Sequence, residues 1–135
     1  MAHEAVVVEL YGNNHDGDPR RFEVYDSQAI TKGTILAFSG ARHVKACSAD
    51  NDVVAGIAAM TKEAGDGSTS ISAWTNGIFD LYCDAAVTLG YDLTVSAANI
   101  LKAYTTLDGE KGYVLGKAME AVGAAGDTIN VRVNL

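Results

Sequence analysis

The chain has 135 residues and a mass of 14.1 kDa, which fits one domain of ordinary size and is too short for two. Its composition is 48% hydrophobic and 20% charged, and this excludes a disordered chain. Ten basic and 17 acidic residues give a net charge of −7, which argues against nucleic-acid binding because that function needs a basic surface.

The first predicted element is a strand close to the N-terminus. Residues 4–11 are rich in valine and strongly β-prone, and a polar loop follows at residues 12–19. A terminal strand of this kind adds to a sheet edge in its own subunit or in a neighbour, and both alternatives stay open. We expect residues 1–27 to form an N-terminal arm with its loop. The candidate residues for contact with a partner protein or a neighbouring subunit are Glu4, Val6, Val7, Val8, Leu10 and Tyr11.

The rest of the chain contains an internal duplication. Residues 29–39 and 86–96 share Ala, Thr, Gly, Leu and Ser at identical offsets, and each copy closes on a Gly-Asp turn and an alternating strand. Two copies are too few for a solenoid, so they predict one domain built as two related halves. We place this duplicated β domain at residues 28–135, with pseudo-repeats at about 29–75 and 86–133.

Within each copy the hydrophobic pattern has a period of two. Residues 128–135 alternate polar and apolar side chains, and residues 78–82 read as a strand that follows a hairpin turn at Asn76-Gly77. Residues 58–64 and 116–121 contain helix formers, but both segments are short and uncapped, so a strand followed by a loop is favoured. The pattern predicts an all-β fold, a small glycine-rich β-barrel or sandwich.

The chain contains no sequence motif for catalysis, phosphate binding or a metal site. The polar loop at residues 13–19 favours a solvated turn, because an EF-hand also needs a glutamate that does not follow at the right spacing. Cys47 and Cys83 indicate two reduced, buried thiols, with a disulfide as the less favoured alternative. We therefore expect no enzyme activity, no catalytic residue, no cofactor and no metal.

The sequence also lacks the features expected of a protein that binds or crosses a membrane. No apolar run approaches the roughly 18 residues of a membrane span, and the first residues lack the basic and apolar regions of a secretory signal. We expect neither a membrane nor a nucleic acid as partner.

The motifs of the duplicated region resemble those of the capsid cement, or head decoration, proteins of tailed viruses (bacteriophages). The resemblance covers roughly residues 28–135 and rests on Thr31-Lys32-Gly33, Thr88-Leu89-Gly90, Gly56-Ile57-Ala58 and the closing segments 116–121 and 126–133. It implies a non-enzymatic virion protein, made in the host cytoplasm, that forms a homotrimer on the outer capsid surface. There it would bridge and stabilise major capsid proteins. The longer N-terminal segment departs from the family pattern.

The alternative function is a binding module, displayed on the virion or tail, that recognises a glycan or a host receptor. Such a module needs a cluster of exposed aromatic side chains. The residues available for it are Trp74, Tyr82, Tyr91 and Tyr104.

Overall fold

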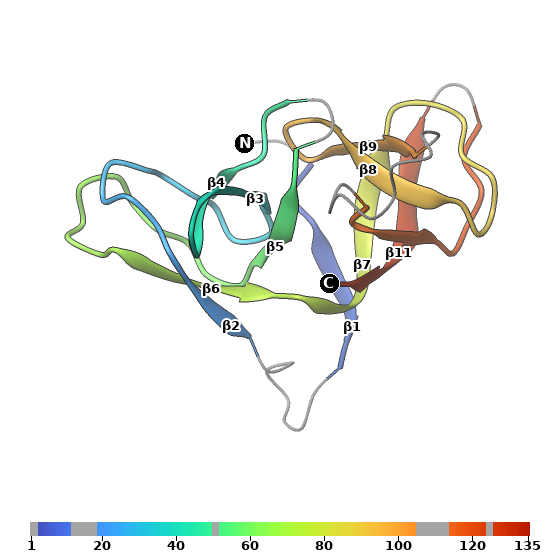
Figure 1. The fold of residues 1–135 in the computed structure, drawn as a ribbon. Coiled ribbons are helices and arrows are strands. Elements are labelled where there is room, and N and C mark those ends of the chain that lie inside the picture. Colours follow the sequence, from blue (N-terminus) through green and yellow to red (C-terminus); the bar gives the residue numbers. More distant parts are fainter. Residues whose placement is uncertain (1–2, 12–18, 50–51, 105–113, 124–125) are drawn as a thin grey trace.

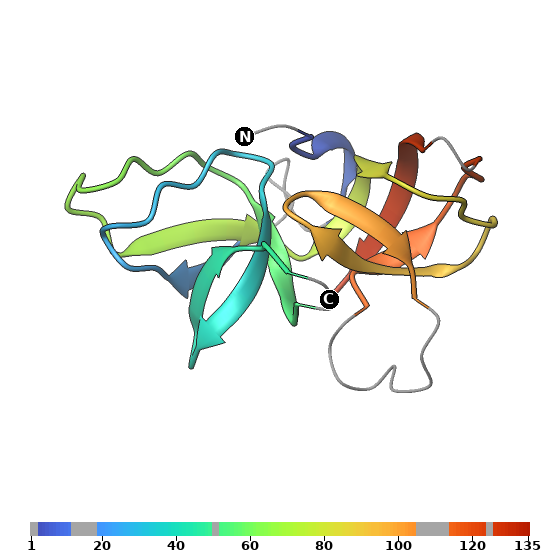
Figure 2. The same ribbon diagram turned by 90° about the horizontal axis from the view of Figure 1, so that it is seen from above.

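The computed structural model describes residues 3–11, 19–49, 52–104, 114–123 and 126–135. These residues form eleven β-strands and contain no helix (Figure 1). Ten of the strands form two closed five-stranded barrels that lie side by side (Figure 2), and the remaining strand, β1, adds to one of them.

The first half of the chain forms barrel 1. Its sheet closes in the order β2-β4-β3-β5-β6, with one parallel pair, β2–β4, and antiparallel pairs elsewhere. The strands are β2 (Arg20–Glu23), β3 (Ile35–Gly40), β4 (His43–Ala46), β5 (Val54–Ala58) and β6 (Ser70–Trp74).

The second half forms barrel 2, whose sheet runs β7-β11-β10-β8-β9 and closes through the parallel pair β7–β9. The strands are β7 (Asn76–Cys83), β8 (Asp92–Ala97), β9 (Ile100–Ala103), β10 (Gly116–Ala118) and β11 (Asp127–Asn134). The predicted all-β barrel class is therefore confirmed, and the chain forms two barrels where one barrel or sandwich was expected.

The strand pairings repeat along with the sequence. The parallel pair Glu23–His43 in barrel 1 corresponds to Tyr82–Ile100 in barrel 2. Each barrel also has an isolated antiparallel bridge outside its named strands, Ile30–Lys62 in the first and Val87–Val122 in the second. In the β3–β4 and β8–β9 hairpins, the corresponding residues Arg42 and Asn99 both have a positive φ, 57° and 56°.

Each barrel begins several residues before the pseudo-repeat that it contains. β2 lies inside residues 1–27, the segment predicted as an arm and its loop, and pairs with β6 and β4 of barrel 1. β7 starts ten residues before the second pseudo-repeat at position 86. These two strands occupy equivalent places although their sequences, RRFE and NGIFDLYC, share no pattern.

Two hydrophobic clusters fill the molecule. The smaller one lies within barrel 1 and includes Leu36, Val44 and Ile71. The larger one fills barrel 2 and extends onto the outer face of barrel 1, where Ile35 and Trp74 belong to it. Since successive strand residues point to opposite faces, β3 directs Leu36 into its own barrel and Ile35 toward the neighbouring one. The two barrels therefore share a packed joint.

The hairpin expected at Asn76-Gly77 is wrong, because β6 and β7 do not pair with each other and belong to different barrels. The glycine is needed for a different reason. A Cβ atom at Gly77 would lie 2.7 Å from the carbonyl oxygen of Glu9, so only glycine lets β1 approach β7 this closely.

The other strand predictions are confirmed where the structure describes them. β5 and β10 each end in a turn or loop and not in a helix. In β11 the side chains of Ile129, Val131 and Val133 are buried, as the alternation predicts, whereas Leu135 lies beyond the strand and is exposed.

A buried lysine ties the β5–β6 loop to barrel 1. The Lys62 ammonium donates hydrogen bonds to the carbonyl oxygens of Asp26 (2.8 Å) and Glu63 (3.0 Å) and to Asp66 Oδ1 (3.1 Å). The Ser68 backbone N–H, which also donates to Asp66, and Lys62 together hold the pKa of the Asp66 carboxyl below its ordinary value of 3.8.

This lowered pKa predicts an acid-sensitive contribution to stability. A lowered folded-state pKa stabilises the protein above about pH 4, and the stabilisation is lost as pH falls through the folded pKa. We expect Asp66→Asn to unfold at a lower urea concentration than the native protein at about pH 6, with a difference that shrinks below pH 4. Urea titrations between about pH 2 and pH 6 measure this, and a difference that does not change with pH contradicts it.

Both cysteines are free and buried. Burial raises the pKa of the Cys47 thiol, and burial together with the nearby Asp84 carboxylate raises that of Cys83 to about 11. The thiolate is the reactive form.

Native-state alkylation is therefore expected to be slow. The rise of the Cys83 pKa from 9.0 to about 11 alone lowers its thiolate fraction at neutral pH about 100-fold. Mass spectrometry after iodoacetamide treatment should find both thiols unmodified in the folded protein and both alkylated in urea. Rapid alkylation of the folded protein contradicts the prediction.

Candidate functional site: interaction surfaces

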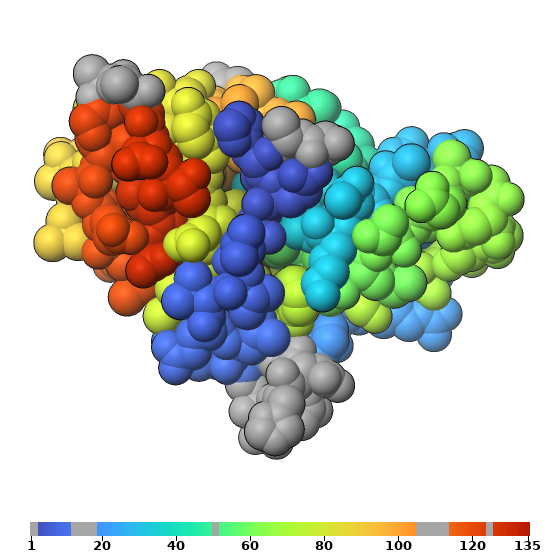
Figure 3. All heavy atoms as spheres, turned by 180° about the vertical axis from the view of Figure 1, so that it is seen from behind, coloured from blue at the N-terminus to red at the C-terminus, as the bar shows by residue number. Residues whose placement is uncertain are grey.

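β1 (Val6–Leu10) belongs to the N-terminal segment that lies on the back of the molecule, blue in Figure 3, and three of its valines are exposed. Their exposed fractions are 61% for Val6, 36% for Val7 and 49% for Val8. A β-bulge between Val7 and Glu9 interrupts the pairing of β1 with β7, and Val8 is the extra residue. β1 thus presents a short apolar ridge.

The other predicted arm residues contact their own chain. Glu4 and Leu10 are half-buried, and Leu10 packs against the larger core cluster. Tyr11 is also half-buried, and the Arg132 guanidinium lies 4.4 Å from the centre of its ring. The Ala5 N–H donates to the carbonyl oxygen of Gly33 in barrel 1 (2.8 Å). β1 therefore adds to a sheet of its own subunit and links the two barrels, and of the six candidates only the valines offer an outward surface.

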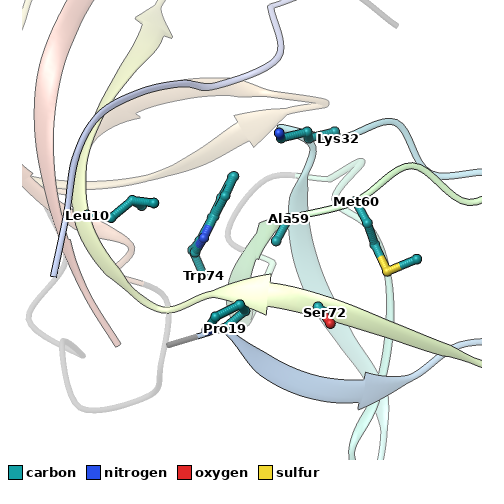
Figure 4. Close-up of a pocket in the computed structure, with 7 residues that line it drawn as sticks. All are labelled: Leu10, Pro19, Lys32, Ala59, Met60, Ser72 and Trp74. Atoms are coloured by element: carbon teal, nitrogen blue, oxygen red, sulfur yellow. The ribbon is translucent and has the colours of Figure 1, made fainter. Parts of the chain in front are cut away.

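A pocket of about 370 Å³ lies beside the joint between the barrels (Figure 4). Its lining residues are Leu10, Pro19, Lys32, Ala59, Met60, Ser72 and Trp74. The Lys32 ammonium lies 5.6 Å from the centre of the Trp74 ring. The described lining residues offer one cation and a serine hydroxyl, and none of them is a carboxylate that could act as acid or base.

The aromatic residues considered for glycan recognition do not form an exposed platform. Trp74 is buried, Tyr104 is half-buried, and the ring of Tyr82 is stacked on His3 with 4.1 Å between the ring centres. Of the four, only Tyr91 is exposed, at 49%. A sugar-binding surface needs several aromatic rings whose faces are exposed to solvent. The arrangement of these four residues therefore does not favour sugar binding.

Sequence reasoning missed an exposed aromatic and basic end of barrel 1, around β2 and the β3–β4 hairpin. Phe38 is 42% exposed, and its ring meets that of Phe22 edge-on with 5.8 Å between the ring centres. Three of the chain's four arginines, Arg20, Arg21 and Arg42, are exposed here. This concentration of arginine in an acidic chain was the sequence signal that could have identified the surface.

A second surface that sequence reasoning missed lies on barrel 2. Leu89, Tyr91 and Met119 are exposed, at 63%, 49% and 45%. Backbone hydrogen bonds from Gly90 N–H to the Ala118 carbonyl oxygen (2.9 Å) and from Ala118 N–H to the Tyr91 carbonyl oxygen (2.9 Å) hold the two segments side by side. No helical pattern or strand alternation distinguishes these residues, so exposure alone identifies them.

Within the part of the chain that the structure describes, no cluster of His, Cys, Asp or Glu is suited to hold a metal ion. The polar loop at residues 13–19 lies mostly outside the described residues. None of the described residues forms a helix able to cross a membrane.

Comparisons with known proteins point to one fold. No family model matches the chain, and no curated protein matches it. The fold is similar to that of the N base of the head fiber protein gp8.5 of bacteriophage phi29, with a TM-score of 0.55 and 15% sequence identity over 86% of this chain and 92% of that chain. At this identity the likeness shows a shared fold, which spans both barrels.

Proposed function

We propose that the protein is a non-enzymatic structural component of a tailed-virus virion that decorates and stabilises the outer capsid surface. In this proposal it acts as a homotrimer that bridges major capsid proteins. The observation that carries the proposal is the fold shared with a phage head fiber protein over 86% of the chain. The cement-protein motifs of the duplicated region support the same role independently of that fold.

The valine ridge of β1 is the proposed capsid contact. Val6 and Val8 are well exposed, yet they sit on a strand that β7 already holds in place. A pre-ordered apolar ridge loses little conformational entropy on binding, so most of its buried area contributes to affinity.

Co-sedimentation with capsids tests whether the protein binds the capsid and whether the valine ridge makes the contact. The capsids are heads of a virus that encodes this chain, assembled without it. We expect the native protein to sediment with the heads, and Val6→Thr/Val8→Thr to bind about tenfold more weakly, because threonine keeps the β-propensity and removes apolar area. Met60→Thr, at another exposed apolar residue, is the matched control and should bind normally. Failure of the native protein to bind heads overturns the proposal, and normal binding by the double variant overturns the role of the ridge.

A further inference from the structure

The two barrels of one chain are joined through the hairpin between β8 and β9. In Figure 2 the tip of this hairpin lies against β3 of barrel 1. The Ile35 N–H at the start of β3 donates to Asn99 Oδ1 in the hairpin (2.8 Å), and the Asn99 N–H donates to Cys47 Sγ (3.4 Å). Asn99 and the nearby Val95 are both fully buried. A hairpin of one barrel thus docks on the wall of the next.

The corresponding hairpin of barrel 1, between β3 and β4, projects away from barrel 2 (Figure 2). Phe38, which corresponds to Val95, is 42% exposed, and Val53 beside it is 39% exposed. Arg42, which corresponds to Asn99, is also exposed, and its guanidinium donates to the carbonyl oxygen of Arg21 (2.8 Å). Barrel 1 therefore presents, uncovered among the described residues, the same element that barrel 2 uses for docking.

The wall of barrel 2 that corresponds to the docking site on barrel 1 is also exposed, as far as the described residues show. Asp92, which corresponds to Ile35, is exposed, as is Glu120 nearby. Leu89, Tyr91 and Met119 lie on the same two segments and are exposed, and the exposed Lys117 pairs with Asp92 across the sheet. Among the described residues, none covers on barrel 2 the site that the β8–β9 hairpin covers on barrel 1.

We propose that a second copy of this chain occupies that site, with its β3–β4 hairpin docked on barrel 2 of its neighbour. The contact repeats the placement of the hairpin inside the chain, so Arg42 of one copy lies opposite Asp92 of the next, in the places of Asn99 and Ile35. The hydrogen bond differs, because Asn99 Oδ1 accepts from the Ile35 N–H whereas the Arg42 guanidinium would donate to the Asp92 carboxylate. An aromatic end with three arginines then meets an apolar surface on which the two acidic residues Asp92 and Glu120 outnumber the one cation, Lys117, which gives the contact both hydrophobic and charge complementarity.

The proposed contact joins two different surfaces, at opposite ends of the molecule in Figure 2. A contact of this kind is heterologous, and it forms a ring when the rotation between copies closes. The inference rests on the self-association part of the proposed function, because a ring of three copies would be the homotrimer, and it assigns the surfaces that would form it.

Charge reversal tests this contact in solution without capsids. We expect the native protein to sediment as an oligomer and Arg42→Glu or Asp92→Arg to weaken association at least tenfold, because each places like charges opposite each other. The double variant Arg42→Glu/Asp92→Arg restores the pair and should assemble again. Glu63→Arg makes the same charge change as Asp92→Arg at an exposed site in the β5–β6 loop of barrel 1 and should leave association unchanged.

Three results overturn the proposal: a native protein that is monomeric up to about 100 μM, single variants that assemble normally, or a double variant no better than the single ones. Binding to heads is measured separately, so a monomer that still sediments with heads refutes this contact and leaves the capsid proposal standing.

Discussion

Replacing Lys62 by glutamate is expected to lower the free energy of unfolding by about 3–5 kcal/mol, because it places an uncompensated charge in a buried site. The Lys62 side chain is fully buried, and its ammonium lies 3.1 Å from an Asp66 oxygen and 3.5 Å from an Asp26 oxygen. A carboxylate there would face two other carboxylates and the carbonyl oxygens that Lys62 now satisfies.

The matched control is Lys62→Met. Val122 occupies the corresponding place in barrel 2, which shows that this position of the fold accepts an apolar side chain. Methionine leaves no buried charge but removes the donor for the Asp26 and Glu63 carbonyl oxygens, so we expect a smaller loss than for glutamate, about 1–2 kcal/mol. Urea unfolding, followed by the fluorescence of Trp74, measures both variants. Equal losses of stability for glutamate and methionine would show that the side chain matters only for its packing.

Asn99→Gly is expected to lower the free energy of unfolding by about 1–3 kcal/mol, the cost of leaving a buried backbone donor unsatisfied. Asn99 Oδ1 accepts the hydrogen bond from the buried Ile35 N–H across the joint between the barrels. Glycine adopts the positive φ at this position without strain, so the substitution isolates the side-chain contact from the backbone conformation.

Arg42→Gly provides the comparison for Asn99→Gly. Arg42 has nearly the same φ at the corresponding hairpin position, but it is exposed, and its hydrogen bond to the Arg21 carbonyl oxygen lies within barrel 1 and not across the joint. We expect a change within about 0.5 kcal/mol, as for most surface substitutions. Both variants are measured by urea unfolding at a low protein concentration, so that association does not contribute. A larger loss for Arg42→Gly than for Asn99→Gly would refute the account of the joint.

The all-β class could be predicted because its signals are local. In residues 128–135 the apolar side chains alternate, and the strand β11 (Asp127–Asn134) buries that face. The duplication could be read because loop residues repeat with the strands. Gly33 and Gly90, for example, have the same left-handed conformation, with φ of 91° and 85°. A positive φ favours glycine wherever it recurs, so such positions stay recognisable when side chains elsewhere diverge.

The division into two barrels could not be predicted, because it depends on contacts between distant residues. β2 and β7 occupy equivalent places in their barrels, and Phe22 of β2 corresponds to Leu81 of β7. The residues on either side of these two are unrelated, so the sequences of the two strands show no repeat. The Asn76-Gly77 pair has the composition of a hairpin turn, whereas its glycine admits the backbone of β1. Likewise, exposure of the valine ridge and of Phe38 depends on what the fold leaves uncovered.

The most direct test of the proposed function is a cryo-EM comparison of heads assembled with and without this protein. The proposal predicts additional density on the outer capsid surface, at three-fold positions between major capsid proteins, into which three copies of the two-barrel chain fit. Heads without such density, or density confined to the tail, would contradict it.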